Sequence, residues 1–248
     1  MDLRLRDKIA LVTGASSGIG QSTAMLFARE GAHVVISYAH NQAAAEATAE
    51  SVRALGQKAW LLRIDLSERE SIESASAWLH ENAQGIDALV LCAGLNIVTP
   101  FAELDWEEWE QVLRVNLSGP FYALRCFAPL LSDGAGVVTV ASVAANTGAP
   151  HHPHYAAAKA GLVNLTKSAA RALAPRVRVN CVSPGITLTP MGIETAASLD
   201  PGYAKSKLLL QRFADPEEVA RVIVFTASPA NSFMTGATLD INGGRDLR

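Results

Sequence analysis

Short apolar runs alternate with longer amphipathic stretches along this chain. The short runs are rich in Val, Ile, Leu and Ala, a pattern that is typical of buried strands. They lie at residues 9–12, 34–36, 60–62, 88–91, 137–140, 177–182 and 238–241. The intervals carry helical periodicity, and we expect helices at residues 19–29, 42–55, 68–81, about 106–131, about 154–173 and 219–226.

This alternation predicts the fold class. Strands that are apolar on both faces occur in parallel sheets that helices cover on both sides, with right-handed connections. The sequence therefore predicts an α/β protein with a doubly wound parallel sheet of about seven strands, the Rossmann fold. No linker divides the chain, so we expect a single domain, residues 1–248. Residues 186–213 lack clear periodicity, and we expect a substrate-binding loop there.

Composition excludes several classes of protein. Hydrophobic residues make up 49% of the chain, and no apolar segment approaches the roughly 18 residues of a membrane helix. Residues 1–8 lack the apolar core of a secretory signal, so we expect a soluble, cytoplasmic protein. A formal net charge of -3 without a long basic run argues against nucleic acid and favours a small-molecule partner. Cys92, Cys126 and Cys181 have no CxxC spacing, which predicts neither a disulfide nor structural zinc.

A glycine-rich turn follows the first predicted strand. Residues 13–20 read TGASSGIG, and a helix begins at the end of this segment. Glycines at such a turn let the backbone approach a pyrophosphate, whose charge is favoured at a helix N-terminus. Because the spacing differs from GxGxxG, the turn alone is also compatible with a simple strand–helix connection.

Polar or small residues also follow the third and fourth predicted strands. Asp65 and Leu66 come after the third, and Cys92, Ala93 and Gly94 come after the fourth. Ligands of open α/β sheets bind at the carboxyl edge of the strands. Asp65 alone is compatible with a helix N-cap, but with the glycine turn present we expect it to contact an adenine.

One tyrosine and one lysine suggest acid–base chemistry. Tyr155 and Lys159 are four residues apart, so they share one face of the helix after the fifth strand. A nearby cation lowers the pKa of a phenol, which can then protonate a carbonyl that accepts hydride, or act in reverse on an alcohol. Ser142 ends the fifth strand, where its hydroxyl can hold the substrate oxygen. Taken alone, the pair is more typical of an exposed tyrosine packed on a lysine stem.

Together these elements resemble the short-chain dehydrogenase/reductase family, in particular its branch of 3-oxoacyl-ACP reductase-like proteins. The TGxxxGIG turn, Asn116, Ser142, the Tyr155-xxx-Lys159 pair and a Pro-Gly turn after the sixth strand span nearly the whole chain. The resemblance implies an enzyme that transfers a hydride between NAD(P)(H) and a carbonyl or secondary alcohol, with Tyr155 as general acid/base. The alternatives are a catalytically silent dinucleotide-binding sensor and an S-adenosylmethionine transferase, and neither needs the Tyr-xxx-Lys pair.

The resemblance also implies roles for individual residues. The catalytic set is Asn116, Ser142, Tyr155 and Lys159, in which Asn116 kinks a helix and holds a water for proton relay through Lys159. The cofactor-binding set is Gly14, Ser16, Ser17, Gly18, Ile19, Gly20, Tyr38, Asp65, Leu66, Ala93, Gly94, Asn116, Tyr155, Lys159, Pro184, Gly185, Thr187 and Thr189. No metal belongs to either set.

The end of the second strand affects the choice of cofactor. Family members that prefer NAD usually have an acid there, which would repel a 2′-phosphate, and residues 37–41 contain none. We therefore expect NADP(H) to be favoured, with NAD(H) as the alternative, although Ser17 stands where NADP-binding turns often have a basic residue. Two further departures are Cys92, where the family usually has asparagine, and Thr187, where it usually has Ile or Val.

Three histidines precede the Tyr155 helix. No acidic or cysteine ligand lies near His151, His152 and His154 in sequence, so we do not expect a metal. We expect these histidines to line the mouth of the substrate site beside Asn146 and Met191.

The sequence does not choose the substrate. A 3-oxoacyl thioester, a sugar or polyol, and a cyclic alcohol all remain open as substrates.

Trp106 and Trp109 begin the helix at about 106–131, where we expect them to be packing residues. As the resemblance implies, this helix and the one at about 154–173 would pair across a twofold axis in a homodimer or homotetramer.

Overall fold

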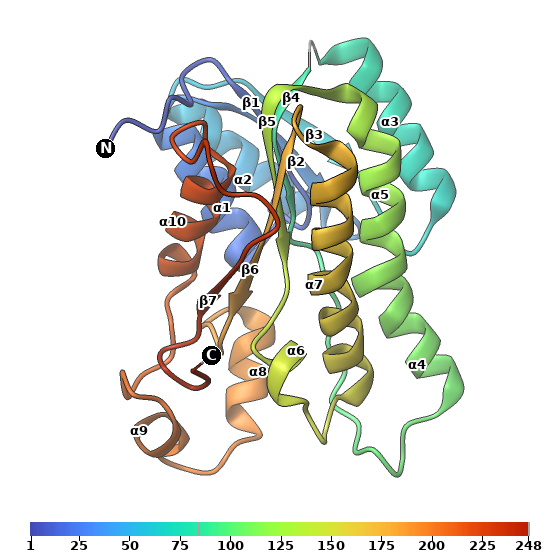
Figure 1. Cartoon of the computed structure of the whole chain (residues 1–248), viewed down its shortest axis with the longest axis vertical. Helices are drawn as coiled ribbons and strands as arrows, with labels where there is room; N and C mark the ends of the chain where they lie inside the picture. Colours follow the sequence, from blue (N-terminus) through green and yellow to red (C-terminus); the bar gives the residue numbers. More distant parts are fainter. Residues whose placement is uncertain (84, 248) are drawn as a thin grey trace.

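A seven-stranded parallel sheet forms the centre of the molecule (Figure 1). The computed structural model describes residues 1–83 and 85–247. The strand order is β3-β2-β1-β4-β5-β6-β7, and every adjacent pair is parallel, which confirms the predicted doubly wound sheet. The strands are β1 (Ile9–Val12), β2 (His33–Tyr38), β3 (Ala59–Arg63), β4 (Ile86–Leu91), β5 (Leu131–Val140), β6 (Arg178–Pro184) and β7 (Thr238–Ile241).

Helices cover both faces of this sheet. Figure 1 shows α1, α2 and α10 on one side and α3, α5 and α7 on the other. The helices are α1 (Gly18–Arg29), α2 (Gln42–Ala54), α3 (Arg69–Asn82), α4 (Trp106–Leu113), α5 (Gly119–Phe127), α6 (Ala144–Thr147), α7 (Pro153–Leu173), α8 (Pro190–Ala197), α9 (Tyr203–Lys207) and α10 (Pro216–Ala227). None of the helices in the described residues is sufficiently long and apolar to cross a membrane.

Alternating strand residues fill two separate cores. In β1, Ala10 and Val12 pack with Phe27 of α1 in one core, while Leu11 packs with Phe127 of α5 in the other. Successive strand side chains point to opposite faces, so a strand covered on both sides must be apolar at every position. This requirement explains why the strands appear in the sequence as continuous apolar runs.

The direction of chain progression across the sheet reverses between β1 and β4. The chain runs outward from β1 to β3, returns to β4 beside β1, and then runs outward to β7. At such a reversal the loops leaving the two central strands diverge and open a crevice at their carboxyl ends. Thr13 bridges the two ends, because its Oγ1 accepts from the backbone N–H groups of Cys92 at 3.0 Å and Ala93 at 3.1 Å.

The helix expected at about 106–131 is wrong in two respects. A π-helical turn at Arg114–Ser118 separates α4 from α5, and β5 already begins at Leu131. Pro120 has no N–H to continue the α-helical pattern, and Pro129 lies in the final 3₁₀ turn. The first six residues of β5 include two polar residues and two glycines, which concealed the strand in the sequence.

The segment 186–213 is not wholly irregular either. It contains α8 and α9, and Thr189 caps α8 by accepting a hydrogen bond from the N–H of Gly192 at 3.0 Å. Pro190 occupies the first helical position, as proline often does. Both helices are short, at eight and five residues, so their periodicity is too brief to stand out in the sequence.

Candidate active site

One cavity of about 910 Å³ follows the carboxyl edge of the sheet. It extends from the glycine turn after β1, past the ends of β3, β4 and β5, to the Pro-Gly turn after β6. The predicted residues that line it are Gly14, Ser16, Ser17, Gly18, Ile19, Gly20, Asp65, Leu66, Ala93, Gly94, Ser142, Tyr155, Lys159, Pro184, Gly185, Thr187 and Thr189. Residues from most of the chain length therefore meet at one site.

The glycine turn is folded so tightly that side chains are excluded. A Cβ on Gly20 would lie 2.3 Å from the carbonyl oxygen of Gly14. Gly14 itself has φ +68, and a Cβ there would lie 2.9 Å from Cα of Ala93. The helix α1 begins at Gly18, so its free N–H groups face the space that these glycines leave. This arrangement suits a phosphate group held by backbone donors.

Ser142, Tyr155 and Lys159 meet at the end of β5. The Lys159 ammonium donates to the carbonyl oxygen of Val140 at 2.8 Å and lies 5.5 Å from the ring centroid of Tyr155. Burial lowers the pKa of Lys159 to about 8. Burial raises the pKa of Tyr155 to about 12, while a hydrogen bond with Ser142 lowers it and Cys92 raises it. The phenol is therefore neutral throughout the physiological pH range.

The expectation that the pKa of Tyr155 lies below its usual value is wrong for this structure, because the net shift is upward. Desolvation of the phenol outweighs the opposing contribution of Ser142. The Lys159 ammonium is held by a backbone carbonyl and approaches the ring rather than pairing with the hydroxyl. A neutral phenol is a proton donor, so Tyr155 can protonate an oxygen that accepts hydride.

Asn116 lies behind the cavity rather than in its wall. Its side chain is fully buried, with Nδ2 donating to the carbonyl oxygens of Leu95 at 2.7 Å and Val112 at 2.9 Å. Its Oδ1 accepts from the N–H of Leu95 at 3.3 Å. The predicted break in the helix is present, because Asn116 lies in the π-helical turn. A Cβ on Gly94 would lie 2.8 Å from Asn116 Oδ1 and 3.4 Å from Lys159 Nζ, so these groups are close neighbours.

We expect Asn116→Asp to lower the free energy of unfolding by about 3 kcal/mol. The carboxylate would replace two N–H donors and face the carbonyl oxygens of Leu95 and Val112 without a counter-charge. Urea unfolding measures this loss, with Asn164→Asp on the exposed face of α7 as the control. Equal stability of the two variants would contradict the structural role of Asn116.

Several residues lie elsewhere than predicted. Tyr38 is absent from the cavity wall and packs against the core, while the three residues after it line the cavity. Of His151, His152 and His154, only His152 lines the cavity. His154 is fully buried, with Nε2 3.2 Å from Oε1 of Glu108, because a side chain preceding Tyr155 on α7 must point away from the cavity. Trp106 is 70% exposed, so it is not a packing residue in this chain.

The predicted surroundings of the histidines also need correction. Met191 lines the cavity, but Asn146 does not. Among residues 1–83 and 85–247, no three His, Cys, Asp or Glu side chains gather as a metal-binding group. Cys92, Cys126 and Cys181 form no disulfide among the described residues.

The cavity wall includes more residues than the sequence predicted, and four of its polar residues come from segments outside the predicted motifs. They are Asn96 after β4, Gln111 on α4, Thr195 on α8, and Arg245 near the C-terminus. Each comes from a segment that the fold brings to the Tyr155 end, and no local pattern distinguishes it. The order of the strands supplies the only signal, because β7 lies beside β6 and delivers the C-terminal segment to the Pro-Gly turn.

Comparisons with known proteins agree with this geometry. A family profile described as Enoyl-(Acyl carrier protein) reductase matches residues 14–246. The chain is 36% identical to the 3-oxoacyl-[acyl-carrier-protein] reductase FabG of Aquifex aeolicus, over 98% of this chain and 99% of that protein. The chain belongs to the short-chain dehydrogenase/reductase family. It is accordingly an NAD(P)-dependent oxidoreductase that acts on a carbonyl or alcohol group, and nothing in the comparisons supports a catalytically silent member of the family.

Other short-chain dehydrogenases/reductases extend the agreement. FabG of Thermotoga maritima is also 36% identical, over 98% of this chain and 99% of that protein. The crystal structure of a short-chain dehydrogenase/reductase SDR:Glucose/ribitol dehydrogenase from Brucella melitensis superposes with a TM-score of 0.93, at 36% identity and full coverage of both chains. A blue fluorescent protein from a metagenomic library, in complex with NADPH, superposes with a TM-score of 0.92 at 28% identity, covering 98% of this chain and 99% of that one.

The residues present fit a nicotinamide dinucleotide. The glycine turn has no room for a Cβ at Gly14, Gly18 or Gly20, so its backbone is bare, and it stands at a helix N-terminus, as a pyrophosphate site requires. Asp65 and Leu66 border the cavity beyond the end of β3, and the Pro184-Gly185 turn borders it beyond β6. The cavity thus offers contacts along its length from the adenine end to the Tyr155 end.

Proposed function

We propose that this chain is an NADPH-dependent reductase of a ketone, with Tyr155 as the proton donor. The observation that carries the proposal is the half-buried, neutral phenol of Tyr155 beside Ser142 and Lys159 at one end of the dinucleotide-sized cavity. NADPH, when bound, supplies the hydride. The relatives named as 3-oxoacyl-[acyl-carrier-protein] reductases support the reductive direction.

Four side chains of this protein have separate roles in the proposed reaction. Ser142 holds the carbonyl oxygen by a hydrogen bond, and Tyr155 gives its proton to that oxygen as negative charge develops there. Lys159, 5.5 Å from the ring centroid, stabilises the tyrosinate that remains. Asn116 is a positioning residue, since it fixes the loop after β4 through both backbone groups of Leu95.

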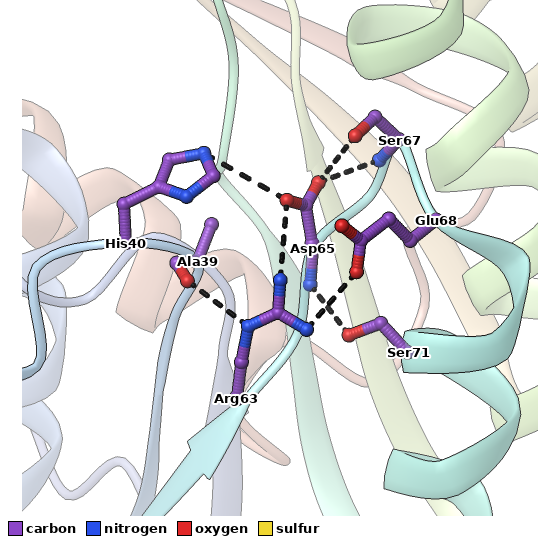
Figure 2. Close-up of polar contacts among 7 residues, drawn as sticks. All are labelled: Ala39, His40, Arg63, Asp65, Ser67, Glu68 and Ser71. Carbon is purple, nitrogen blue, oxygen red and sulfur yellow. Dashed lines mark hydrogen bonds and ion pairs between the residues drawn. The ribbon is translucent and has the colours of Figure 1, made fainter.

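The preference for NADPH rests on the charges at the adenine end (Figure 2). His40 follows β2, is largely exposed, and has its Nε2 3.7 Å from Oδ2 of Asp65. The Arg63 guanidinium lies 3.7 Å from the same oxygen and donates to the carbonyl oxygen of Ala39 at 3.3 Å. Burial raises the pKa of Asp65, but hydrogen bonds from Ser67 and the nearby His40 and Arg63 bring it below the usual value. Arg63 also pairs with Glu68 at 3.0 Å, so its charge is shared between two carboxylates. The proposed preference for a 2′-phosphate therefore rests on the absence of an acid from residues 37–41 and on the basic side chains of His40 and Arg63 beside them.

We expect His40→Asp to weaken NADPH binding by about 10- to 100-fold while changing NADH binding much less. A carboxylate at position 40 would add to the charge of Asp65 and repel the 2′-phosphate. Nicotinamide fluorescence titrations with NADPH and NADH measure both affinities. His80→Asp on the exposed face of α3 is the control. An equal loss for both cofactors in His40→Asp would rule out a 2′-phosphate site there.

A turnover assay tests the proposed reaction. NADPH oxidation is followed with four ketones, namely a 3-oxobutanoyl thioester, 4-oxopentanoate, dihydroxyacetone and cyclohexanone. Reduction of any of them supports the proposal, and bound NADPH that is oxidised by none contradicts it.

We further propose a cytoplasmic homodimer or homotetramer that buries the exposed Trp106 and Phe121 of α4 and α5. A monomeric mass in solution light scattering would contradict the proposal of a homodimer or homotetramer.

A further inference from the structure

The cavity wall near Tyr155 includes a cation that has no carboxylate partner among the described residues. Arg245 lines the cavity, and among residues 1–83 and 85–247 no carboxylate forms an ion pair with it. Its guanidinium carbon lies 5.8 Å from the ring centroid of Tyr203 on α9. The guanidinium thus stacks on an aromatic ring, which leaves its N–H donors available to a ligand.

The segment that carries Arg245 is firmly held. Asn242 is buried, and its Oδ1 accepts from the N–H groups of Gly244 at 2.9 Å and Arg245 at 3.1 Å. Its Nδ2 donates to the carbonyl oxygen of Asp246 at 2.9 Å. Gly244 has φ +77, and a Cβ there would meet Leu209 at 2.7 Å, so only glycine fits this turn. A turn fixed on both sides of Arg245 sets the direction of its side chain.

The guanidinium and the phenol face the same part of the cavity. His152 is a neighbour of both groups. Its ring contacts that of Tyr155 edge-on at a centroid distance of 6.1 Å. Burial, His154, His151 and Arg245 together lower the pKa of His152, which places Arg245 within electrostatic reach of this imidazole. A ligand that contacts Tyr155 and Ser142 can therefore extend toward Arg245.

The remaining charges of the cavity do not compete for this position. Asp65 is the one acid among the described residues of the cavity wall, and it is engaged by Ser67 at the adenine end. Lys159 is engaged by the carbonyl oxygen of Val140, and Arg114 also borders a second hollow beside Leu66. The Tyr155 end therefore carries net positive charge and no acid.

We propose that Arg245 binds an anionic group of the substrate, so that this enzyme selects ketones that carry a carboxylate or phosphate. A guanidinium matches either oxyanion with paired N–H donors. Asn96, Gln111 and Thr195 add polar groups to the same end of the cavity, as suits a polar substrate. The inference rests on the proposed function and names its class of substrate.

Paired substrates test this assignment. We expect the wild type to prefer 4-oxopentanoate to its methyl ester, or dihydroxyacetone phosphate to dihydroxyacetone, by about 10- to 100-fold in kcat/KM. Arg245→Met keeps an unbranched side chain and removes the charge, so it should abolish that preference and leave the neutral ketone within threefold. Arg221→Met, on the exposed face of α10, is the control and should retain the preference. A preference in the first pair identifies a carboxylate site, and one in the second identifies a phosphate site.

A binding measurement separates this proposal from the proposed reaction. Calorimetric titration of Tyr155→Phe with the same compounds, in the presence of NADPH, reports affinity without turnover. If the wild type reduces no ketone, the proposed function fails. The anion site would still be supported if Tyr155→Phe binds the charged compound more tightly than the neutral one, and if adding Arg245→Met to Tyr155→Phe removes this difference. Equal affinity for the charged and neutral compounds, or equal losses of both in the Arg245 variant, would overturn the assignment.

Discussion

Tyr155→Phe should lower kcat by about 10³-fold while leaving the protein folded. The ring keeps its edge-on contact with His152 and its position over Lys159, because only the hydroxyl is removed. The developing alkoxide would then lack its proton donor, and a water cannot easily replace a group that is held beside Ser142. Steady-state NADPH oxidation measures kcat, and fluorescence titration should give NADPH affinity within a few-fold of the wild type.

Tyr122→Phe is the matched control for that experiment. Tyr122 lies on α5 outside the cavity, where its hydroxyl contacts Glu73 and Arg69. Its turnover should equal that of the wild type within twofold. Turnover of Tyr155→Phe above one-tenth of the wild-type value would show that another group donates the proton.

Lys159→Met should abolish most activity and raise stability at the same time. Burial lowers the pKa of Lys159 from 10.5 to about 8, so at pH 7 the native state holds an ammonium that it disfavours by about 3 kcal/mol. Methionine removes this penalty and loses one hydrogen bond to Val140, worth about 1 kcal/mol. We expect the free energy of unfolding at pH 7 to rise by about 2 kcal/mol and kcat to fall at least 100-fold.

The difference in free energy of unfolding between Lys159→Met and the wild type should depend on pH. Between pH 8 and 10.5 the unfolded wild type binds the proton that the native state has released, so the stability of the wild type rises with pH. The advantage of Lys159→Met should therefore be full below pH 8 and shrink as the pH rises toward 10.5. Lys167→Met, on the exposed face of α7, should show no such trend. A constant difference across this range would contradict the depressed pKa.

Much of the fold follows from the sequence because buried parallel strands leave a strong local pattern. The run at residues 9–12 coincides with β1, and the run at 238–241 coincides with β7. The pattern failed where a strand was not apolar: the polar and glycine residues at the start of β5 hide it. It also failed where a side-chain hydrogen bond, rather than the hydrophobic periodicity, determines the backbone conformation, as with Asn116 in its π-helical turn.

The candidate site divides in the same way. Residues in contiguous motifs, such as the glycine turn and the Tyr155–Lys159 pair, could be located because their spacing implies their geometry. The high pKa of Tyr155 could not be foreseen, because it depends on burial that only the packed structure sets. Arg245 could not be found either, since its place in the cavity depends on β7 lying beside β6 and on the turn that Asn242 holds.

Transfer of deuterium from NADPH is the most direct test of the central claim. The wild type would be incubated with NADPH labelled at either C4 position and with the ketones named above, and the alcohol analysed by mass spectrometry. The account predicts an alcohol that contains deuterium from one of the two epimers only, and no product with Tyr155→Phe over the same time. Alcohol without label from either epimer, or full production by Tyr155→Phe, would contradict hydride transfer through this site.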